Sequence, residues 1–126
     1  MKTARMELGA RGEEEACKYL EERGHTVLAR NWRHSHLEVD IISLDRSGVH
    51  FVEVKTRMAP VSAEPEENVT YAKQRKITAA ANAFLHGKRM TGFGDVEVFF
   101  DVVSVIFAGE KVEITYFPQA YLPMYF

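Results

Sequence analysis

The sequence predicts an α/β domain with a mixed central sheet of about five strands flanked by helices. Three observations lead to this prediction. Two long segments space their apolar residues as helices do, and five shorter segments show the alternation or apolar density of strands. Their order is α-β-β-β-α-β-β. The length of 126 residues suits one core, so we expect residues 1–126 to form a single domain.

The first helix is predicted over 3–23, where Ala16, Cys17 and Leu20 form an apolar stripe at helical spacing. Glu13 lies on the same stripe, so we expect it on the buried side of the helix. An acid near a helix N-terminus is also favoured by the helix dipole, which gives Glu13 an alternative, purely structural explanation.

Three strand candidates follow this helix. Residues 26–31 form a short candidate, and 37–45 form a stronger one. A turn signal, Asp-Arg-Ser-Gly, separates the second candidate from an alternating segment at 49–57, which predicts an antiparallel hairpin. Residues 58–68 contain two prolines and an acidic run, and we expect a mobile loop there.

The second half of the chain predicts a helix over 69–89 and two further strands, at 96–107 and at 111–117, the last of them at a sheet edge. Residues 118–126 form an aromatic, proline-broken tail that either covers the end of the core or forms a dimer surface. The expected buried positions of the second helix are Val69, Ala72, Ile77, Ala80, Ala81, Phe84 and Leu85.

Composition narrows the class of protein. An apolar content of 46% and a charged content of 27% are ordinary for a globular protein. The single cysteine excludes an internal disulfide, and no apolar segment approaches the length that spans a bilayer, so we expect a cytoplasmic protein without a membrane partner. The net charge of −2 argues against a general nucleic-acid coat, although the basic residues are clustered.

Acidic side chains gather on the predicted hairpin. Side chains alternate along a strand, so Glu38, Asp40 and Ile42 are expected on one face of the first strand, and Val39 and Ile41 on the other. A carboxylate on a face that also holds an apolar core residue is unusual, because burial disfavours its charged form.

Glu53 and Lys55 share a face of the next strand. If Asp40 and Glu53 lie on the same side of the hairpin, two carboxylates and an ammonium meet, and Glu13 can add a third carboxylate. A divalent cation such as Mg²⁺ relieves the repulsion, and a metal-bound water beside Lys55 can attack a phosphodiester. The alternative is that Glu53 and Lys55 form a solvated pair on an exposed face.

Basic residues flank the predicted cluster. Lys73 and Lys76 lie on one side of the second helix, where they can contact phosphates, and Arg33 and Arg57 can extend this surface. The alternative for the helix residues is a solvated face.

A transition-metal site offers another interpretation. His34, His36, Glu38 and Asp40 would all point one way on an extended strand and could bind Zn²⁺. We favour a loop for both histidines, which leaves this set incomplete.

The order of several segments resembles that of the YraN-like family, small bacterial proteins with a restriction-endonuclease-like fold. The resemblance covers roughly residues 5–107, and the segments that carry it read GARGEEEACKYLEERGHTVLARNWR, LEVDII, FVEVKTR, NVTYAKQRKITAAANAFL and FDVVSV. The family is similar to archaeal Holliday-junction resolvases within the PD-(D/E)XK nuclease group. The resemblance therefore implies a restriction-endonuclease-like arrangement of the predicted sheet.

The resemblance also implies residue roles. Glu13, in a Gly-x-x-Gly-Glu motif, is the helix-borne acid, and Asp40, in Glu-x-Asp, is the central metal ligand. Glu53 and Lys55, in Glu-x-Lys, are the second ligand and the catalytic lysine, and the backbone carbonyl of Val54 completes the metal site. The implied cofactor is Mg²⁺, with Mn²⁺ as a substitute. The implied partner is branched or single-strand-containing DNA, and a homodimer is consistent with paired nicks.

The chain departs from the family pattern at three positions. Val39 precedes Asp40 where the group name has proline, Leu37 stands where glycine is common, and Phe100 stands where arginine is common. We expect a metal-dependent endonuclease that cleaves DNA by structure. The alternative is a non-catalytic nucleic-acid-binding or scaffold protein that retains the fold.

Overall fold

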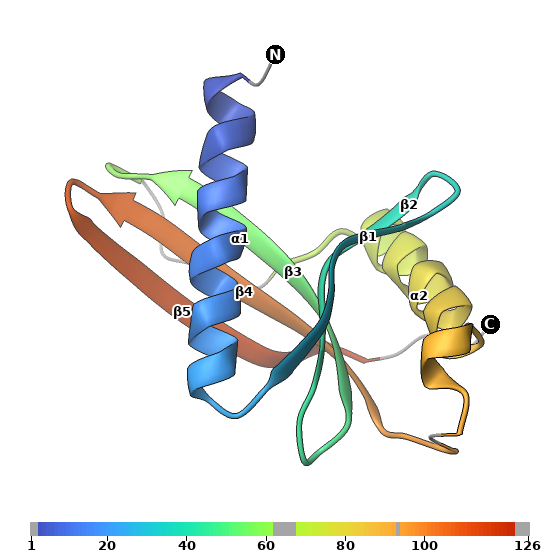
Figure 1. The fold of residues 1–126 in the computed structure, drawn as a ribbon. Coiled ribbons are helices and arrows are strands. Elements are labelled where there is room, and N and C mark those ends of the chain that lie inside the picture. Colours follow the sequence, from blue (N-terminus) through green and yellow to red (C-terminus); the bar gives the residue numbers. More distant parts are fainter. Residues whose placement is uncertain (1–2, 62–67, 93, 123–126) are drawn as a thin grey trace.

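A computed structural model describes residues 3–61, 68–92 and 94–122 of the protein. Five strands and two α-helices follow one another in the predicted order, which confirms the predicted fold class (Figure 1). A short 3₁₀ helix, η1, follows the second α-helix. The elements are α1 (Ala4–Glu22), β1 (Thr26–His34), β2 (Leu37–Leu44), β3 (Val49–Met58), α2 (Tyr71–Leu85), η1 (Lys88–Met90), β4 (Val98–Ala108) and β5 (Lys111–Tyr121).

The strands form one mixed sheet in the order β1-β2-β3-β4-β5. β3 and β4 are parallel, and all other neighbouring strands are antiparallel. A parallel pair requires a long crossover connection, and α2 lies within that connection. The predicted hairpin is therefore present as β2 and β3, and β5 lies at an edge as predicted.

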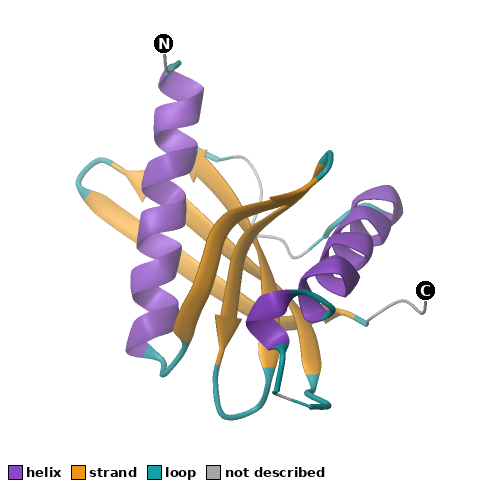
Figure 2. Ribbon diagram, turned by 45° about the vertical axis from the view of Figure 1, so that its right-hand side comes forward, coloured by secondary structure: helices purple, strands orange, loops and turns teal. Residues whose placement is uncertain are grey.

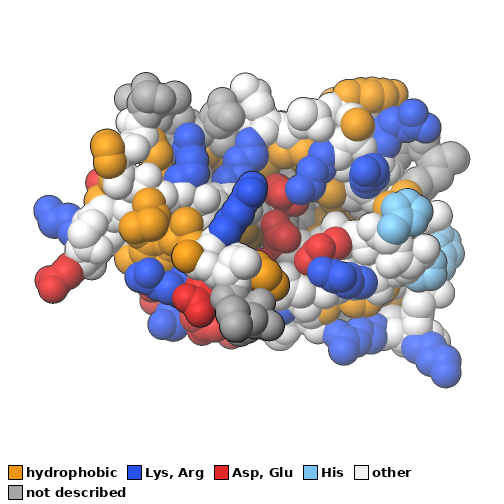
Figure 3. All heavy atoms as spheres, turned by 90° about the horizontal axis from the view of Figure 1, so that it is seen from above, with side chains coloured by type: hydrophobic (Ala, Val, Ile, Leu, Met, Phe, Trp, Pro, Cys, Tyr) orange, Lys and Arg blue, Asp and Glu red, His pale blue; other side chains and the backbone are white. Residues whose placement is uncertain are grey.

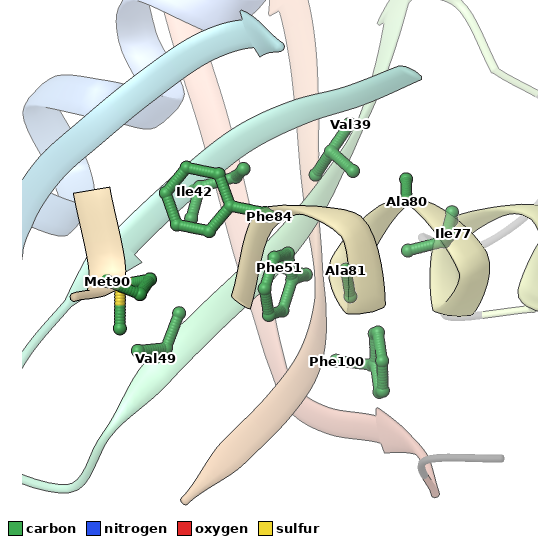
Figure 4. Close-up of a cluster of buried hydrophobic side chains, with 10 residues drawn as sticks. All are labelled: Val39, Ile42, Val49, Phe51, Ile77, Ala80, Ala81, Phe84, Met90 and Phe100. Carbon is green, nitrogen blue, oxygen red and sulfur yellow. The ribbon is translucent and has the colours of Figure 1, made fainter. Parts of the chain in front are cut away.

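The two helices cover opposite faces of the sheet. On the α1 face, Leu20 packs with Ile41 and Val52, whereas on the α2 face Phe84 packs with Phe51. Figure 2 shows strands between the two helices, and Figure 4 shows the apolar cluster beneath α2. Within the described ranges, both helices are too short or too polar to traverse a lipid bilayer.

Both helices are fixed by caps that the apolar pattern does not reveal. Thr3 accepts a hydrogen bond from the Met6 N–H at the start of α1, and Thr70 does the same for Lys73 at the start of α2. The prediction of one helix over 69–89 is therefore wrong at both ends. The helix stops at Leu85.

The buried side of α2 is smaller than predicted. Ala72 is exposed, which contradicts the prediction, because it lies in the first turn, where α2 is only beginning to meet the sheet. Val69 and Leu85 are half-buried and pack against the edge of the cluster. The remaining predicted positions are buried: Ile77, Ala80, Ala81 and Phe84.

The two edge strands extend beyond their predicted ends. β1 continues to His34, and β5 continues through Pro118 to Tyr121, so the first four residues of the predicted tail are strand. Each edge strand also has a register shift against its neighbour. Residues 62–67 and 123–126, which contain most of the predicted mobile loop and the end of the tail, lie outside the described residues.

The expected alternation along β2 is wrong at one position. Val39 packs in the α2 cluster with Ile42, whereas Ile41 packs under α1. The prediction had placed Val39 with Ile41. The β1–β2 hairpin twists and curves past α2 as it leaves the sheet, so its outer residues turn toward the helix (Figure 1). This curvature opens the region that holds Asp40.

Candidate active site

The predicted acids line two hollows at which residues of α1, β2, β3 and α2 come together. Asp40 lines two hollows of about 210 and 280 Å³. Glu53 and Lys73 line the first hollow, and Glu13 lines the second. Figure 3 looks onto this face and shows acidic side chains near its centre, with lysine and arginine side chains around them.

Asp40 lies where β2 separates from β3. The last paired residues of the two strands are Ile41 and Val52, and the Val54 N–H donates to the Asp40 carboxylate at 2.8 Å. Burial, followed by the nearby charges of Glu53 and Glu13, raises the pKa of Asp40 to about 8. Asp40 is therefore mostly protonated at neutral pH, and a nearby cation would favour its charged form.

Glu53 forms an ion pair with α2. The Lys73 ammonium lies 2.8 Å from the Glu53 carboxylate, which is 13% exposed. Burial works against the charge of Lys73, but the hydrogen bond to Glu53 and the negative charges of the nearby acids together outweigh burial, so the pKa of Lys73 is raised. Lys73, which the sequence suggested as a phosphate contact, is thus held within the acidic cluster.

Glu13 reaches the cluster because α1 lies against β3. A Cβ atom added to Gly12 would lie 1.9 Å from Thr56 Oγ1, so only glycine permits this approach. Glu13 is half-buried, and burial raises its pKa, with smaller contributions from Glu38 and Glu53 in the same direction. Three separate elements therefore bring one acid each to the two hollows, and Asp40 lines both of them.

The three carboxylates are neighbours but do not form a closed ligand set. In the described part of the chain, one trio of His, Cys, Asp or Glu residues has ligand atoms that all lie within 4.8 Å of one another. That trio is His25, Asp45 and His50, and it includes none of the three predicted acids.

Lys55 does not contact the acids in this structure. Its ammonium donates to the backbone carbonyl of Asn68, and the ammonium that meets Glu53 comes from Lys73. Sequence reasoning predicted Lys73 only as a phosphate contact beside the acids. The sequence does not reveal how α2 docks on the sheet, and this docking brings Lys73 to Glu53. The catalytic role of Lys55 stays a prediction.

The other predicted phosphate contacts differ in their surroundings. Lys76 is exposed and lines the same hollow as Asp40. Arg33 lies 3.4 Å from Glu38 in an exposed pair. Arg57 is half-buried, and two of its guanidinium nitrogens have no hydrogen-bond partner among the described residues.

The alternative zinc set is not assembled. His34 stacks on Trp32 at the end of β1, and His36 lies in the exposed turn that follows, beside Ser35. Within residues 3–61 these histidines do not come together with Glu38 and Asp40 as a ligand group. His36 lines the same hollow as Glu38 and Asp40, but His34 does not, because it lies on β1 before the turn.

Comparison with known proteins places these residues in a family. The model of "Uncharacterised protein family UPF0102" matches residues 12–105, a range that contains all four predicted catalytic residues. A UPF0102 protein of Bacteroides thetaiotaomicron is 38% identical over 120 residues, which cover 95% of this chain and 96% of the relative. A UPF0102 protein of Desulforamulus reducens is 40% identical over 111 residues, which cover 87% and 89%. These matches agree with the YraN-like resemblance: the chain belongs to the uncharacterised protein family UPF0102.

Proposed function

We propose that the protein is a metal-dependent endonuclease that hydrolyses phosphodiester bonds in branched or single-strand-containing DNA. The observation that supports the proposal is the environment of Asp40, whose pKa is raised to about 8 by burial and by two further acids. Placing several acids close together destabilises a fold, because their charges repel. A site for a divalent cation nevertheless needs several carboxylates, so their presence here supports a functional role.

The donor set suits Mg²⁺ or Mn²⁺. Asp40 and Glu53 offer hard carboxylate oxygens, and Val54 lines the same hollow as Asp40 and Glu13. These residues would hold the cation, which when bound neutralises charge on the attacked phosphate and lowers the pKa of water. For the cation to bind, Lys73 would either leave Glu53 or share the Glu53 carboxylate with the cation.

The chain's own residues supply orientation and positive charge. The Val54 N–H fixes the direction of the Asp40 carboxylate, and the Lys73 ammonium pairs with the Glu53 carboxylate. Lys76 stands free at the rim, where its ammonium can contact a DNA phosphate. The lysine at the acidic cluster in this proposal is therefore Lys73, with Lys55 able to take part only if it leaves Asn68.

A second candidate function is DNA binding without cleavage. It is favoured by two observations: the three carboxylates are not grouped within 4.8 Å of one another, and the ion pair with Lys73 already satisfies Glu53. A protein that has kept the fold as a scaffold would need the basic rim but not the metal.

The test is a cleavage assay on supercoiled, branched and single-stranded DNA with Mg²⁺, Mn²⁺ or EDTA. We expect metal-dependent nicking that falls by about 100-fold or more in Asp40→Asn and Glu53→Gln. The matched control is Glu110→Gln, an exposed acid in the β4–β5 turn, which should keep full activity.

Two results would count against the proposal. Salt-sensitive DNA binding without metal-dependent cleavage would support the binding protein instead. Cleavage that is equal in Asp40→Asn, Glu53→Gln and the control would come from another enzyme in the preparation.

A further inference from the structure

A second polar cluster lies near the β2–β3 turn, away from the candidate active site. His25 immediately precedes β1, Asp45 follows β2, and His50 lies in β3. One ligand atom from each residue lies within 4.8 Å of the other two. His50 is on the α1 face of the sheet, because it alternates with Phe51 of the α2 cluster, so it lies on the opposite face from Glu53.

The three residues present their ligand atoms at distances that fit one small ion. His50 Nε2 lies 2.8 Å from one Asp45 carboxylate oxygen, and His25 Nε2 lies 3.4 Å from the other. Ligand atoms bound tetrahedrally to Zn²⁺ lie roughly 3.3 Å from one another. Small side-chain adjustments would therefore bring all three atoms to ligand distance.

The remaining ring nitrogen of each histidine is already held. His50 Nδ1 lies 2.7 Å from the carboxylate of Asp101, and His25 Nδ1 lies 2.8 Å from Ser43 Oγ. Histidines that ligate metals usually use the other ring nitrogen in this way, which orients the ring.

Asp101 is itself fixed. It is fully buried in β4, accepts a hydrogen bond from the Tyr116 hydroxyl at 2.5 Å, and accepts another from the Gln119 N–H at 2.9 Å. The cluster therefore has a complete supporting layer behind one of its ligands, which a chance grouping of surface side chains lacks.

The facing atoms of His50 and Asp45 need a positive group between them. If the His50 Nδ1–H donates to Asp101, the Nε2 atom presents a lone pair to the Asp45 carboxylate, 2.8 Å away. At this separation a shared proton holds the two atoms together, and a metal ion that replaced the proton would move them apart to roughly 3.3 Å. These two occupants make different, measurable predictions.

We infer that His25, Asp45 and His50 form a Zn²⁺ site, with a fourth position for water, that joins the α1–β1 turn to the β2–β3 hairpin. Two imidazoles and one carboxylate favour Zn²⁺ over Mg²⁺, which prefers oxygen ligands alone. The Asp45 side chain is 22% exposed, so the site is open to solvent on the turn side. The ion would bind N-terminal and central segments of the fold together.

The test begins with metal-free protein, prepared with a chelator that is then removed. We expect calorimetry to show one Zn²⁺ per chain, and Co²⁺ to give the visible absorption bands of a tetrahedral site. Zinc at 100 times its dissociation constant should raise the melting temperature by about 5–10 °C, because it binds only the folded state.

Matched variants assign the site. Asp45→Asn keeps the turn, since an amide oxygen can still accept from the Ser47 and Gly48 N–H groups, but it removes a charged ligand. We expect Asp45→Asn and His25→Gln to lose the Co²⁺ bands and the melting-temperature shift. His86→Gln, at the exposed end of α2, should retain both.

The inference is overturned if metal-free wild-type protein shows no saturable Zn²⁺ binding and no thermal shift. The cluster would then be a protonated His50 between two aspartates. It is also overturned if binding survives in Asp45→Asn and His25→Gln and disappears in Asp40→Asn, because the ion would then lie at the acidic hollow. Folding of each variant is checked by circular dichroism before metal is added.

Discussion

Asp40 is proposed to bind a metal ion through its charged form, but the charged form destabilises the fold. Its pKa is raised to about 8 in the fold, against roughly 3.9 for an unfolded chain. The folded protein therefore holds a proton between these values that the unfolded chain has released. The contribution of protonated Asp40 to the stability of the fold is fully present below pH 4 and is lost as the pH rises through 8.

We predict that Asp40→Asn stabilises the protein at pH 8 by about 1–2 kcal/mol, less than the full pKa difference because the side chain keeps some solvent contact. The gain should vanish near pH 4 and level off above pH 8. Urea unfolding of both proteins across this range measures it. A constant difference at every pH would show that the ionisation of Asp40 is not the cause.

The two lysines of the site should behave differently. Lys73 pairs with the carboxylate of Glu53, whose side chain is largely buried, whereas Lys55 contacts the Asn68 carbonyl. We predict that Lys73→Ala lowers stability by about 1–3 kcal/mol, because it leaves Glu53 without its partner, and that Lys55→Ala changes stability by less than about 1 kcal/mol.

Thermal unfolding measures both, with Lys111→Ala, an exposed lysine at the start of β5, as the control. A double substitution that adds Glu53→Gln to Lys73→Ala should recover part of the loss. Equal effects of the two lysine substitutions would contradict the assignment of Lys73 as the partner of Glu53.

Sequence reasoning could bring Asp40 and Glu53 together only on the condition that both side chains lie on the same side of the hairpin, because alternation relates residues within a strand and not between strands. It could not find the partnership of Lys73 with Glu53, which depends on how α2 docks. It also missed the trio of His25, Asp45 and His50. Those residues share no spacing signal, since they meet only when a turn, a hairpin and a strand are folded together.

At the scale of the element, α1 shows why the motif Gly-x-x-Gly-Glu has glycine at its fourth position. Gly12 touches Thr56 of β3, whereas a Cβ at Gly9 would meet nothing within 4 Å. The close contact sets the height of α1 above the sheet and hence the position of Glu13.

We predict that Gly12→Ala destabilises the protein by about 1–3 kcal/mol, because Thr56 is short and stiff and cannot move aside cheaply. Gly9→Ala should instead stabilise it by about 0.5–1 kcal/mol through helix propensity. Denaturant unfolding of the two variants compares the same change three residues apart. Similar effects would mean that propensity, and not the contact with β3, dominates.

The type and order of the helices and strands could be predicted from the sequence, but their lengths were predicted less well. Apolar periodicity identifies each helix and strand, but pairing with a neighbour lengthens a strand beyond its own signal. β5 continues past the proline at position 118 because it is at the sheet edge, where a missing N–H is tolerated. Helix ends depended on threonine caps, which are weaker signals than a run of apolar residues.

For the whole molecule, a net charge of −2 conceals an uneven distribution, with acids inside the hollow and bases around it (Figure 3). Under the proposed function, a DNA backbone would meet the rim first. Lys76 is exposed on this rim, and Lys111, at the start of β5, is exposed outside it.

We predict that Lys76→Ala weakens DNA binding and lowers the slope of log affinity against log salt concentration by about 0.7–0.9, the value for one lost phosphate contact. Lys111→Ala should leave the slope unchanged. Fluorescence anisotropy at several salt concentrations, with metal chelated, gives both slopes. An unchanged slope in Lys76→Ala would remove the rim from the proposed binding surface.

The irregular outer strands affect how copies of the protein can associate. Each has a register shift and a non-glycine residue with positive φ, at Asn31 in β1 and Gln119 in β5, and Pro118 withholds an amide proton. A straight row of free backbone groups would template the addition of further chains, whereas interrupted rims discourage it. The irregular edge strands therefore oppose the sideways addition of strands from further copies of the chain.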